Sequence, residues 1–384
     1  MARRALIVGI PVAIAVAGVV TSVRSHDSPT PAPTPPVAPV VTAVAAVASD
    51  VPDPVSTGTL GDPIAIPSPL PEDSVPRAVM GDPVPLAPAG SSYRRVFGRR
   101  GMNPGEFAYP RAIVCAADGW VYVVDKRGRI QAFDPDLRVR ALTRTPQSIV
   151  GAPTGLAMAG SGKLLVADTH YARVLTYSKE LVLESGWGRP GSRDGGFLYL
   201  ADAREAPGGL FVTLDYFNDM ARLQIWRQGE LVKRIGRFGD GPREFKRPMA
   251  LALDEKHQEL WIADSENNRI QVLRWPDGAL LRTLGGLGQE PGKLKFPYDI
   301  SIDDEGRAWI AEFGNHRLQV LDRDGKSLAI WGSPGRELGE LGEPWGVALA
   351  PNGLAYVLDS ANERVYELER SRVLEGSRGG STGR

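Results

Sequence analysis

The sequence has a single cysteine, Cys115, among its 384 residues. One thiol excludes an intramolecular disulfide and any metal cluster built on cysteines. Net charge is absent too: 45 basic residues balance 45 acidic ones, so no overall field points to nucleic acid or to a membrane surface. Sustained helical periodicity is also lacking in the repeated part of the chain described below. These absences favour an all-β domain whose function depends on local groups.

An apolar run follows two arginines at the N-terminus. Residues 5–20 are uninterruptedly apolar, a pattern shared by secretory signal peptides and signal anchors. The run is at the short edge of what spans a bilayer, and we expect residues 1–24 to be an uncleaved signal anchor or else a signal peptide. In either case the remainder is expected outside the cytoplasm. It would be membrane-anchored and face the periplasm or extracellular side, or be secreted if the signal is cleaved.

A proline-rich stretch follows, and a polar tail ends the chain. Residues 28–90 hold 16 of the 32 prolines, which favours extended, semi-rigid conformations. We therefore predict a disordered linker over 25–90 that holds the next domain away from a membrane. Residues 371–384 are rich in Gly and Ser, and we expect a disordered tail there.

The segment WIADSENNRIQV (261–272) has five counterparts along residues 91–370. Each copy has an acid after an apolar run, and these acids recur every 43 to 49 residues: Asp125, Asp168, Asp215, Asp264, Glu312 and Asp359. An apolar residue precedes each acid by 18 or 19 positions: Phe107, Val150, Phe197, Phe245, Leu294 and Leu341. A proline follows that residue three positions later in five copies, and a glycine pair such as IGRFG (235–239) precedes it in five.

The spacing of short β-rich runs predicts four strands per copy, which we name a to d. In the fourth copy these are 249–253, 260–263, 270–274 and 280–284. Four antiparallel strands repeated six times are typical of a six-bladed β-propeller. The sixth copy lacks strand d, and residues 93–97 are expected to supply it by pairing with the last blade. That pairing closes the ring and removes an exposed edge.

The combined pattern of paired glycines, proline, acid, asparagine and RIQV resembles NHL repeats over residues 93–368. The resemblance implies a six-bladed propeller. It implies no single function, because relatives include RNA-binding, receptor, scaffolding and lyase proteins.

The recurring Asp264 and Arg269 are expected to form a partly exposed ion pair that clamps the b–c hairpin, worth about 1 kcal/mol. Asn267 recurs as Asn315 and Asn362, at a place where a hairpin needs a residue with positive φ. A site rarely repeats in every blade, so this motif is interpreted as structural.

Residues that depart from the repeat mark the candidate site. The d–a and b–c loops crowd one mouth of the central channel, and residues just after the proline form its rim. We predict a binding surface there for a protein, peptide or glycan. The alternative is that rim residues only face water. The candidate binding residues are Arg111, Asp202, Arg204, Glu205, Tyr216, Tyr298, Asp299, Phe313 and Trp345.

The third blade carries charges where other blades are apolar. Asp202, Arg204 and Glu205 either pair internally or face a polar site, because an unpaired buried charge costs several kcal/mol. Asp202, Glu205 and Asp299 could also supply oxygens to calcium. This leaves a metal-dependent hydrolase or lyase as the alternative function, while the non-enzymatic reading needs no cofactor.

Zinc chemistry and nucleic-acid binding fit the sequence poorly. Relatives that are zinc lyases place histidines after the proline, whereas His170, His257 and His316 are split between the two mouths. Basic residues in two d–a loops are offset by Glu337, Glu340 and Glu343 on the same face. We therefore predict a membrane-tethered binding or scaffolding module that does not bind nucleic acid.

Overall fold

The computed structural model describes residues 77–78, 82–217 and 220–376. The predicted anchor or signal peptide, most of the predicted linker and residues 377–384 lie outside the described residues. Within the described part, no helix is long and apolar enough to cross a membrane.

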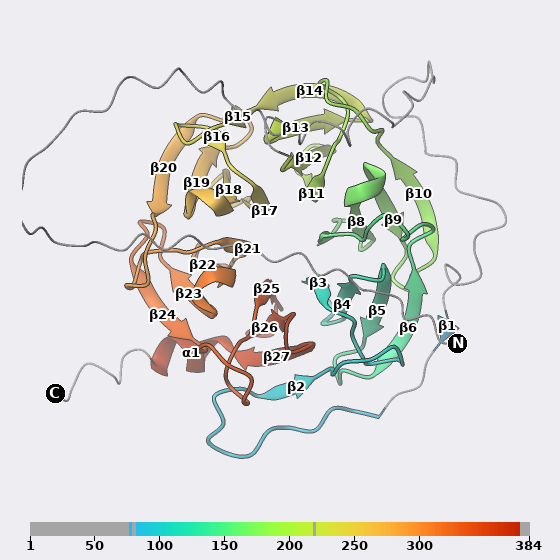
Figure 1. The fold of residues 1–384 in the computed structure, drawn as a ribbon, viewed down its shortest axis with the longest axis vertical. Coiled ribbons are helices and arrows are strands. Elements are labelled where there is room, and N and C mark those ends of the chain that lie inside the picture. The colour runs from blue at the N-terminus through green and yellow to red at the C-terminus, as the bar shows by residue number, and fades with distance from the viewer. Residues whose placement is uncertain (1–76, 79–81, 218–219, 377–384) are drawn as a thin grey trace, which may run out of the picture. The chain divides into compact units, whose positions relative to one another are not determined.

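Six sheets of antiparallel strands surround a central axis (Figure 1). Each strand pairs with the next along the chain, as predicted. Blade 1 holds β3 (Pro110–Cys115), β4 (Val121–Asp125), β5 (Arg129–Phe133) and β6 (Val139–Arg144); blade 2, β7 (Gly155–Met158), β8 (Leu164–Asp168), β9 (Arg173–Tyr177) and β10 (Leu183–Trp187); blade 3, β11 (Leu200–Ala206), β12 (Leu210–Asp215), β13 (Arg222–Arg227) and β14 (Glu230–Ile235).

The other three blades follow the same plan. Blade 4 holds β17 (Pro248–Asp254), β18 (Glu259–Asp264), β19 (Arg269–Arg274) and β20 (Leu280–Gly285); blade 5, β21 (Pro297–Ile302), β22 (Ala308–Glu312), β23 (Arg317–Leu321) and β24 (Ser327–Trp331); blade 6, β25 (Pro344–Leu349), β26 (Leu354–Asp359) and β27 (Arg364–Glu369). The four strands predicted for the fourth copy are confirmed, each to within one residue at either end.

The second strand of a blade is apolar on both faces because neighbouring blades cover both. β18 and β26 are buried at every residue. Trp261 and Trp309 are fully buried in this way. Burying a large apolar side chain contributes roughly 1.5–3 kcal/mol, so the packing between blades supplies much of the stability.

The ring closes as predicted. β2 (Arg95–Phe97) pairs antiparallel with β27 and becomes the outer strand of blade 6 (Figure 1). Glu367 on β27 is fully buried and accepts two hydrogen bonds from the Arg95 guanidinium, at 2.7 and 2.6 Å. The Tyr356 hydroxyl donates to the same carboxylate at 3.0 Å. A buried ion pair thus fastens the N-terminal strand to the C-terminal blade.

Both predicted disordered segments are partly ordered where they meet the propeller. β1 (Arg77–Ala78) pairs with the outer strand β6, and the Val84 amide donates to the Asp136 carbonyl at 3.1 Å. At the other end, α1 (Arg370–Gly376) buries Val373 against blades 5 and 6. The linker and tail boundaries were therefore placed too close to the repeats, because these segments cover an open strand edge and apolar surface that the repeats leave exposed.

The d–a loops also follow the repeat, with one exception. In five of them the apolar residue predicted upstream of the acid is fully buried and bridges to the start of its loop, as in β15 (Arg237–Phe238) and β16 (Glu244–Phe245). The exception is Val150, which is 71% exposed, contrary to expectation. Pro153 follows Arg144 by 9 positions, whereas Pro297 follows the equivalent residue Gly285 by 12, so this segment is too short to form the same loop.

Candidate functional site

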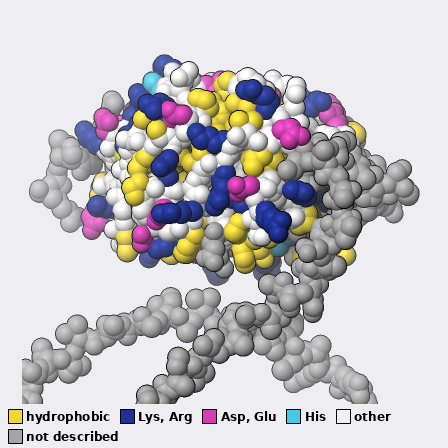
Figure 2. All heavy atoms as spheres, turned by 90° about the horizontal axis from the view of Figure 1, so that it is seen from above, with side chains coloured by type: hydrophobic (Ala, Val, Ile, Leu, Met, Phe, Trp, Pro, Cys, Tyr) yellow, Lys and Arg dark blue, Asp and Glu magenta, His cyan; other side chains and the backbone are white. Residues whose placement is uncertain are grey.

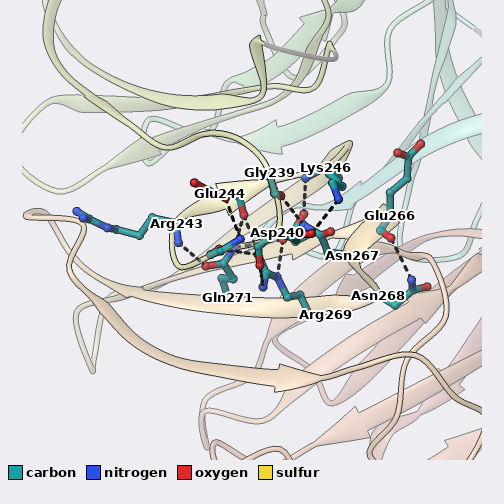
Figure 3. Close-up of polar contacts among 12 residues, drawn as sticks. Gly239, Asp240, Arg243, Glu244, Lys246, Glu266, Asn267, Asn268, Arg269 and Gln271 are labelled. Carbon is teal, nitrogen blue, oxygen red and sulfur yellow. Dashed lines mark hydrogen bonds and ion pairs between the residues drawn. The ribbon is translucent and has the colours of Figure 1, made fainter.

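The recurring acid and arginine join two elements rather than one. Asp264 is fully buried and accepts a hydrogen bond from Arg269 Nε at 2.7 Å (Figure 3). The remaining guanidinium nitrogens donate to the carbonyls of Asp240, Gly241 and Glu244, at 2.6 to 2.9 Å. The pair therefore ties the b–c hairpin to the preceding d–a loop. The pair is partly exposed on the side of Arg269, as expected, but the expectation that it clamps the hairpin alone was wrong, because the loop carbonyls complete the guanidinium's hydrogen bonding.

Asn267 recurs in the repeat for a reason that differs from the one expected. The left-handed residue is its neighbour Asn268, with φ 55°. Asn267 instead donates to the Gly239 carbonyl and to Asp264, both at 2.9 Å (Figure 3). Asn315 and Asn362 make the equivalent two contacts. The amide is used as a donor to the loop, and the motif is structural as predicted.

Blade 2 is the exception in this network. Arg129, Arg222, Arg317 and Arg364 each donate to carbonyls of their own d–a loop. Arg173 instead donates to Asp168 at 2.8 Å, and one of its terminal nitrogens is buried with no partner in the described residues. One Asp168 oxygen is likewise buried without a hydrogen-bond partner among the described residues. Burial raises the pKa of Asp168 to about 6, although Arg173 opposes this shift. Because the loop 145–153 is short, Arg173 contacts Asp168 but donates to no loop carbonyl in the described part of the chain.

An aromatic layer closes the channel at the mouth formed by the d–a and b–c loops. Tyr298 stacks on Phe313, with centroids 4.5 Å apart, and meets the Trp345 ring edge-on at 4.8 Å. Met249 and Tyr216 pack into the same cluster. The cavity beneath this layer has a volume of about 20 Å³, which is room for about one water molecule. The mouth is thus a shallow surface over a filled channel.

Arg111 lies at this mouth without a carboxylate partner. Its guanidinium carbon is 4.2 Å from the centroid of the Trp345 ring and 4.9 Å from that of Tyr109. Among the described residues, none receives a hydrogen bond or ion pair from this guanidinium. Glu343 is an acid whose charge raises the pKa of Arg111, but its carboxylate accepts a hydrogen bond from the Tyr109 hydroxyl instead. Burial lowers the pKa of Arg111, and the charge of Glu343 offsets this only in part.

A second cation, Arg247, lies across the same layer. Its guanidinium carbon is 5.7 Å from the Tyr298 centroid, and its only ion pair in the described part is a loose one to Glu266 at 3.9 Å. Lys126 is 5.9 Å from the Tyr109 centroid on the side of blade 1. Three positive side chains therefore face aromatic rings around one opening.

The charges inside the channel are paired, which settles one alternative left open by the sequence. Arg204 donates to Asp202 at 3.0 and 3.1 Å. Asp299 accepts backbone N–H groups from Ile300 at 2.8 Å and Val347 at 2.9 Å, and Asp202 accepts the equivalent pair from blades 3 and 4. Burial raises the pKa of Asp299 to about 7, with Arg204 opposing the shift. Both carboxylates fasten an inner strand to the next blade.

Glu205 is not at the mouth. Its carboxylate accepts the Gly160 amide at 2.8 Å, in the a–b turn of blade 2 at the opposite end of the ring. Asp202, Glu205 and Asp299 therefore do not converge, and no group of three His, Cys, Asp or Glu in the described part could hold a metal ion. The three carboxylates considered as an alternative calcium ligand set are therefore not brought together, because Glu205 alternates to the other face of β11.

The structure brings most of the predicted residues together. Arg111, Asp202, Arg204, Tyr298, Asp299 and Trp345 line the cavity, and Tyr216 and Phe313 pack in the layer above it. The sequence interpretation missed Tyr109, Arg247 and Glu343. All three occupy the position just before the recurring proline, so the register that located the rim could have found them had it been extended by one residue.

The remaining charges are distributed over the surface. Viewed edge-on, the wall of the ring shows Lys and Arg interspersed with hydrophobic side chains and with Asp and Glu (Figure 2). Several basic residues of the d–a loops pair with acids, including Arg99 with Glu106 and Arg237 with Glu244. Arg111, by contrast, is partly buried and makes no ion pair with any described residue.

Comparison with known proteins agrees with this architecture. Residues 245–273, which span β16 to β19, match the NHL repeat family. The domain is an NHL-repeat β-propeller. No curated protein matches the sequence.

Solved structures resemble the NHL-repeat propeller in fold. A streptogramin B lyase structure has a TM-score of 0.51 at 12% identity and covers 71% of this chain and 96% of its own. A gluconolactonase from Xanthomonas campestris has a TM-score of 0.53 at 15% identity, with coverage of 76% and 97%. An auxiliary nutrient binding protein from Bacteroides thetaiotaomicron has a TM-score of 0.53 at 11% identity, with coverage of 76% of each chain. At these identities the likeness shows the fold alone.

Proposed function

We propose that this NHL-repeat propeller is a non-enzymatic binding module whose channel mouth receives a partner protein or peptide. The observation that carries the proposal is Arg111, a partly buried guanidinium that packs beside two aromatic rings and makes no ion pair with any described residue. Leaving a cation in such a place costs free energy that a ligand would recover. We also propose that residues 1–24 anchor the chain in a membrane and hold the propeller on its outer side, because these residues include a long apolar run.

A polypeptide suits this surface better than a glycan. A sugar ring binds on an open aromatic face, and Tyr298 and Trp345 are only 6% and 7% exposed. A peptide needs no such platform, because it can insert one side chain and make backbone hydrogen bonds to the surrounding loops. Catalysis is disfavoured by the filled channel: a cavity of about 20 Å³ holds no substrate, and both oxygens of Asp299 are engaged by backbone amides.

A photo-crosslinking side chain placed at Phe217 tests the proposal. Phe217 stacks on Tyr199 beside the mouth and is 37% exposed. The matched control carries the same group at Val232, which is 55% exposed on the outer strand β14. In the native host we expect a discrete crosslinked partner from position 217 and none from position 232. Equal labelling at both positions, or none at 217, would show that the mouth is not the binding surface.

A further inference from the structure

We infer that the group received at the mouth is a carboxylate of an acidic peptide, bound by the N–H edge of Arg111. This rests on the proposed function and names the chemistry of the ligand at the same site. It would be an aspartate or glutamate side chain, inserted as the charged tip of an extended segment.

The stacking of Arg111 determines which part of its guanidinium is left to bind. Trp345 and Tyr109 both lie within 5 Å of the guanidinium carbon. Ring contacts of this kind attract the cation without using its hydrogen-bond donors. None of the five N–H donors of Arg111 reaches an acceptor among the described residues, so they are left to bind a ligand. A planar edge of free donors matches the two oxygens of a carboxylate, which it can bind in bidentate fashion.

Other arginines in the same channel and loops show what Arg111 lacks. Arg204, one layer deeper, reaches Asp202 at 3.0 Å, and Arg269 in the blade 4 clamp reaches Asp264 at 2.7 Å. The fold therefore supplies an acid wherever an arginine has a structural role in these places. At Arg111 the one nearby acid, Glu343, is bonded to Tyr109. An absent anion at this position is a property of this site rather than of the fold.

The surrounding charges select for the same ligand. Arg247 and Lys126 face the aromatic layer from other blades and add positive potential. Asp202 and Asp299 lie deeper; Arg204 pairs with Asp202, and burial raises the pKa of Asp299 to about 7, which reduces its negative charge near neutral pH. The cavity below has room for about one water molecule and excludes a whole ring, so the ligand is bound at the mouth itself. An incoming anion thus meets three cations beside a largely buried aromatic layer, with Glu343 and Glu266 offsetting part of the charge of Arg111 and Arg247. Electrostatic interactions at such a partly buried place are stronger than in water.

The test titrates the protein with two blocked peptides that differ only in one residue, glutamate or glutamine, using calorimetry and side-chain NMR. We expect the glutamate peptide to bind at least about tenfold more tightly, since a hydrogen bond to a charged group contributes about 1.5–3 kcal/mol. Arg111→Gln should abolish that preference, and Arg111→Lys should retain part of it. Arg336→Gln, which removes an exposed arginine from the blade 6 loop, is the matched control and should change nothing.

The outcomes separate this inference from the proposed function. Equal binding of the two peptides, or a preference that survives Arg111→Gln, overturns the carboxylate assignment. If an oligomer of glucuronic acid binds through Arg111 and the peptides do not, the carboxylate is right but the peptide assignment is overturned. If the peptides fail while crosslinking at position 217 still yields a partner, the mouth is a binding surface for a ligand of other chemistry. If both fail, the proposed function fails as well.

Discussion

Replacing Arg269 with glutamine should destabilise the propeller far more than the same change at Arg173. Arg269 holds one buried carboxylate and three loop carbonyls, whereas Arg173 holds one carboxylate and no loop carbonyl. Removing one partner of a buried ion pair costs about 3–5 kcal/mol, and this part is shared by both variants. The hydrogen bonds to the loop are made by a charged donor, and losing them should lower the unfolding free energy by a further amount of about 1.5–3 kcal/mol.

Denaturant unfolding of the two variants, with Arg336→Gln as a surface control, measures this difference. Arg269→Gln should lower the unfolding free energy by about 2 kcal/mol more than Arg173→Gln. Hydrogen exchange should locate the effect, with faster exchange in the loop 236–247 and little change in 145–153. Equal destabilisation by the two substitutions, with unchanged exchange in 236–247, would refute the role of the guanidinium in fastening the loop.

Three further predictions follow from other sites. Asp299 has a pKa of about 7 in the folded chain, above its ordinary value of 3.8, so between about pH 4 and pH 7 the folded state holds a proton that the unfolded state has released. The stability contributed by this group therefore falls as pH rises. In urea titrations, the unfolding free energy of Asp299→Asn relative to the wild type should rise by up to about 4 kcal/mol from pH 4 to pH 8. Glu367→Gln should cost about 3–5 kcal/mol and accelerate hydrogen exchange in β2, because the buried carboxylate fastens the closing strand; unchanged exchange in β2 would contradict that role. Gly236→Ala should lower the melting temperature more than Gly353→Ala, because both glycines have positive φ but only at Gly236 does an added Cβ meet a buried ring, that of Phe245, at 2.3 Å; equal effects would mean that backbone strain alone decides.

The fold could be predicted from the sequence because the repeat constrains it six times. Each copy fixes the strand lengths, and the register from acid to proline fixes which loops share a face. The closing strand was predictable because a ring with a missing outer strand leaves an edge that 93–97 can fill. The boundaries were less accessible, since β1 and α1 are held by contacts with the propeller and carry no repeat pattern of their own.

The candidate site was predictable in position but not in detail. Residues after the proline line the channel in the five blades that have the proline, so Arg111, Tyr298 and Trp345 were found. Glu205 was misplaced because it lies one position from Arg204, and alternate residues of a strand face opposite sides. Arg111 packs against rings rather than acids in part because of Tyr109. The backbone of Tyr109 has a positive φ of 56°, and the periodicity of the sequence does not predict a residue in that conformation.

The account is tested most directly by following the Arg111 Nε–Hε NMR signal while a glutamate-containing peptide is added to the full-length protein. The assignment comes from its loss in Arg111→Gln. A saturable shift of this signal with the glutamate peptide, and none with the glutamine peptide, is the predicted result. A signal that does not move while the peptide binds, or that moves equally with both peptides, would contradict the claim that the channel mouth binds a carboxylate through Arg111.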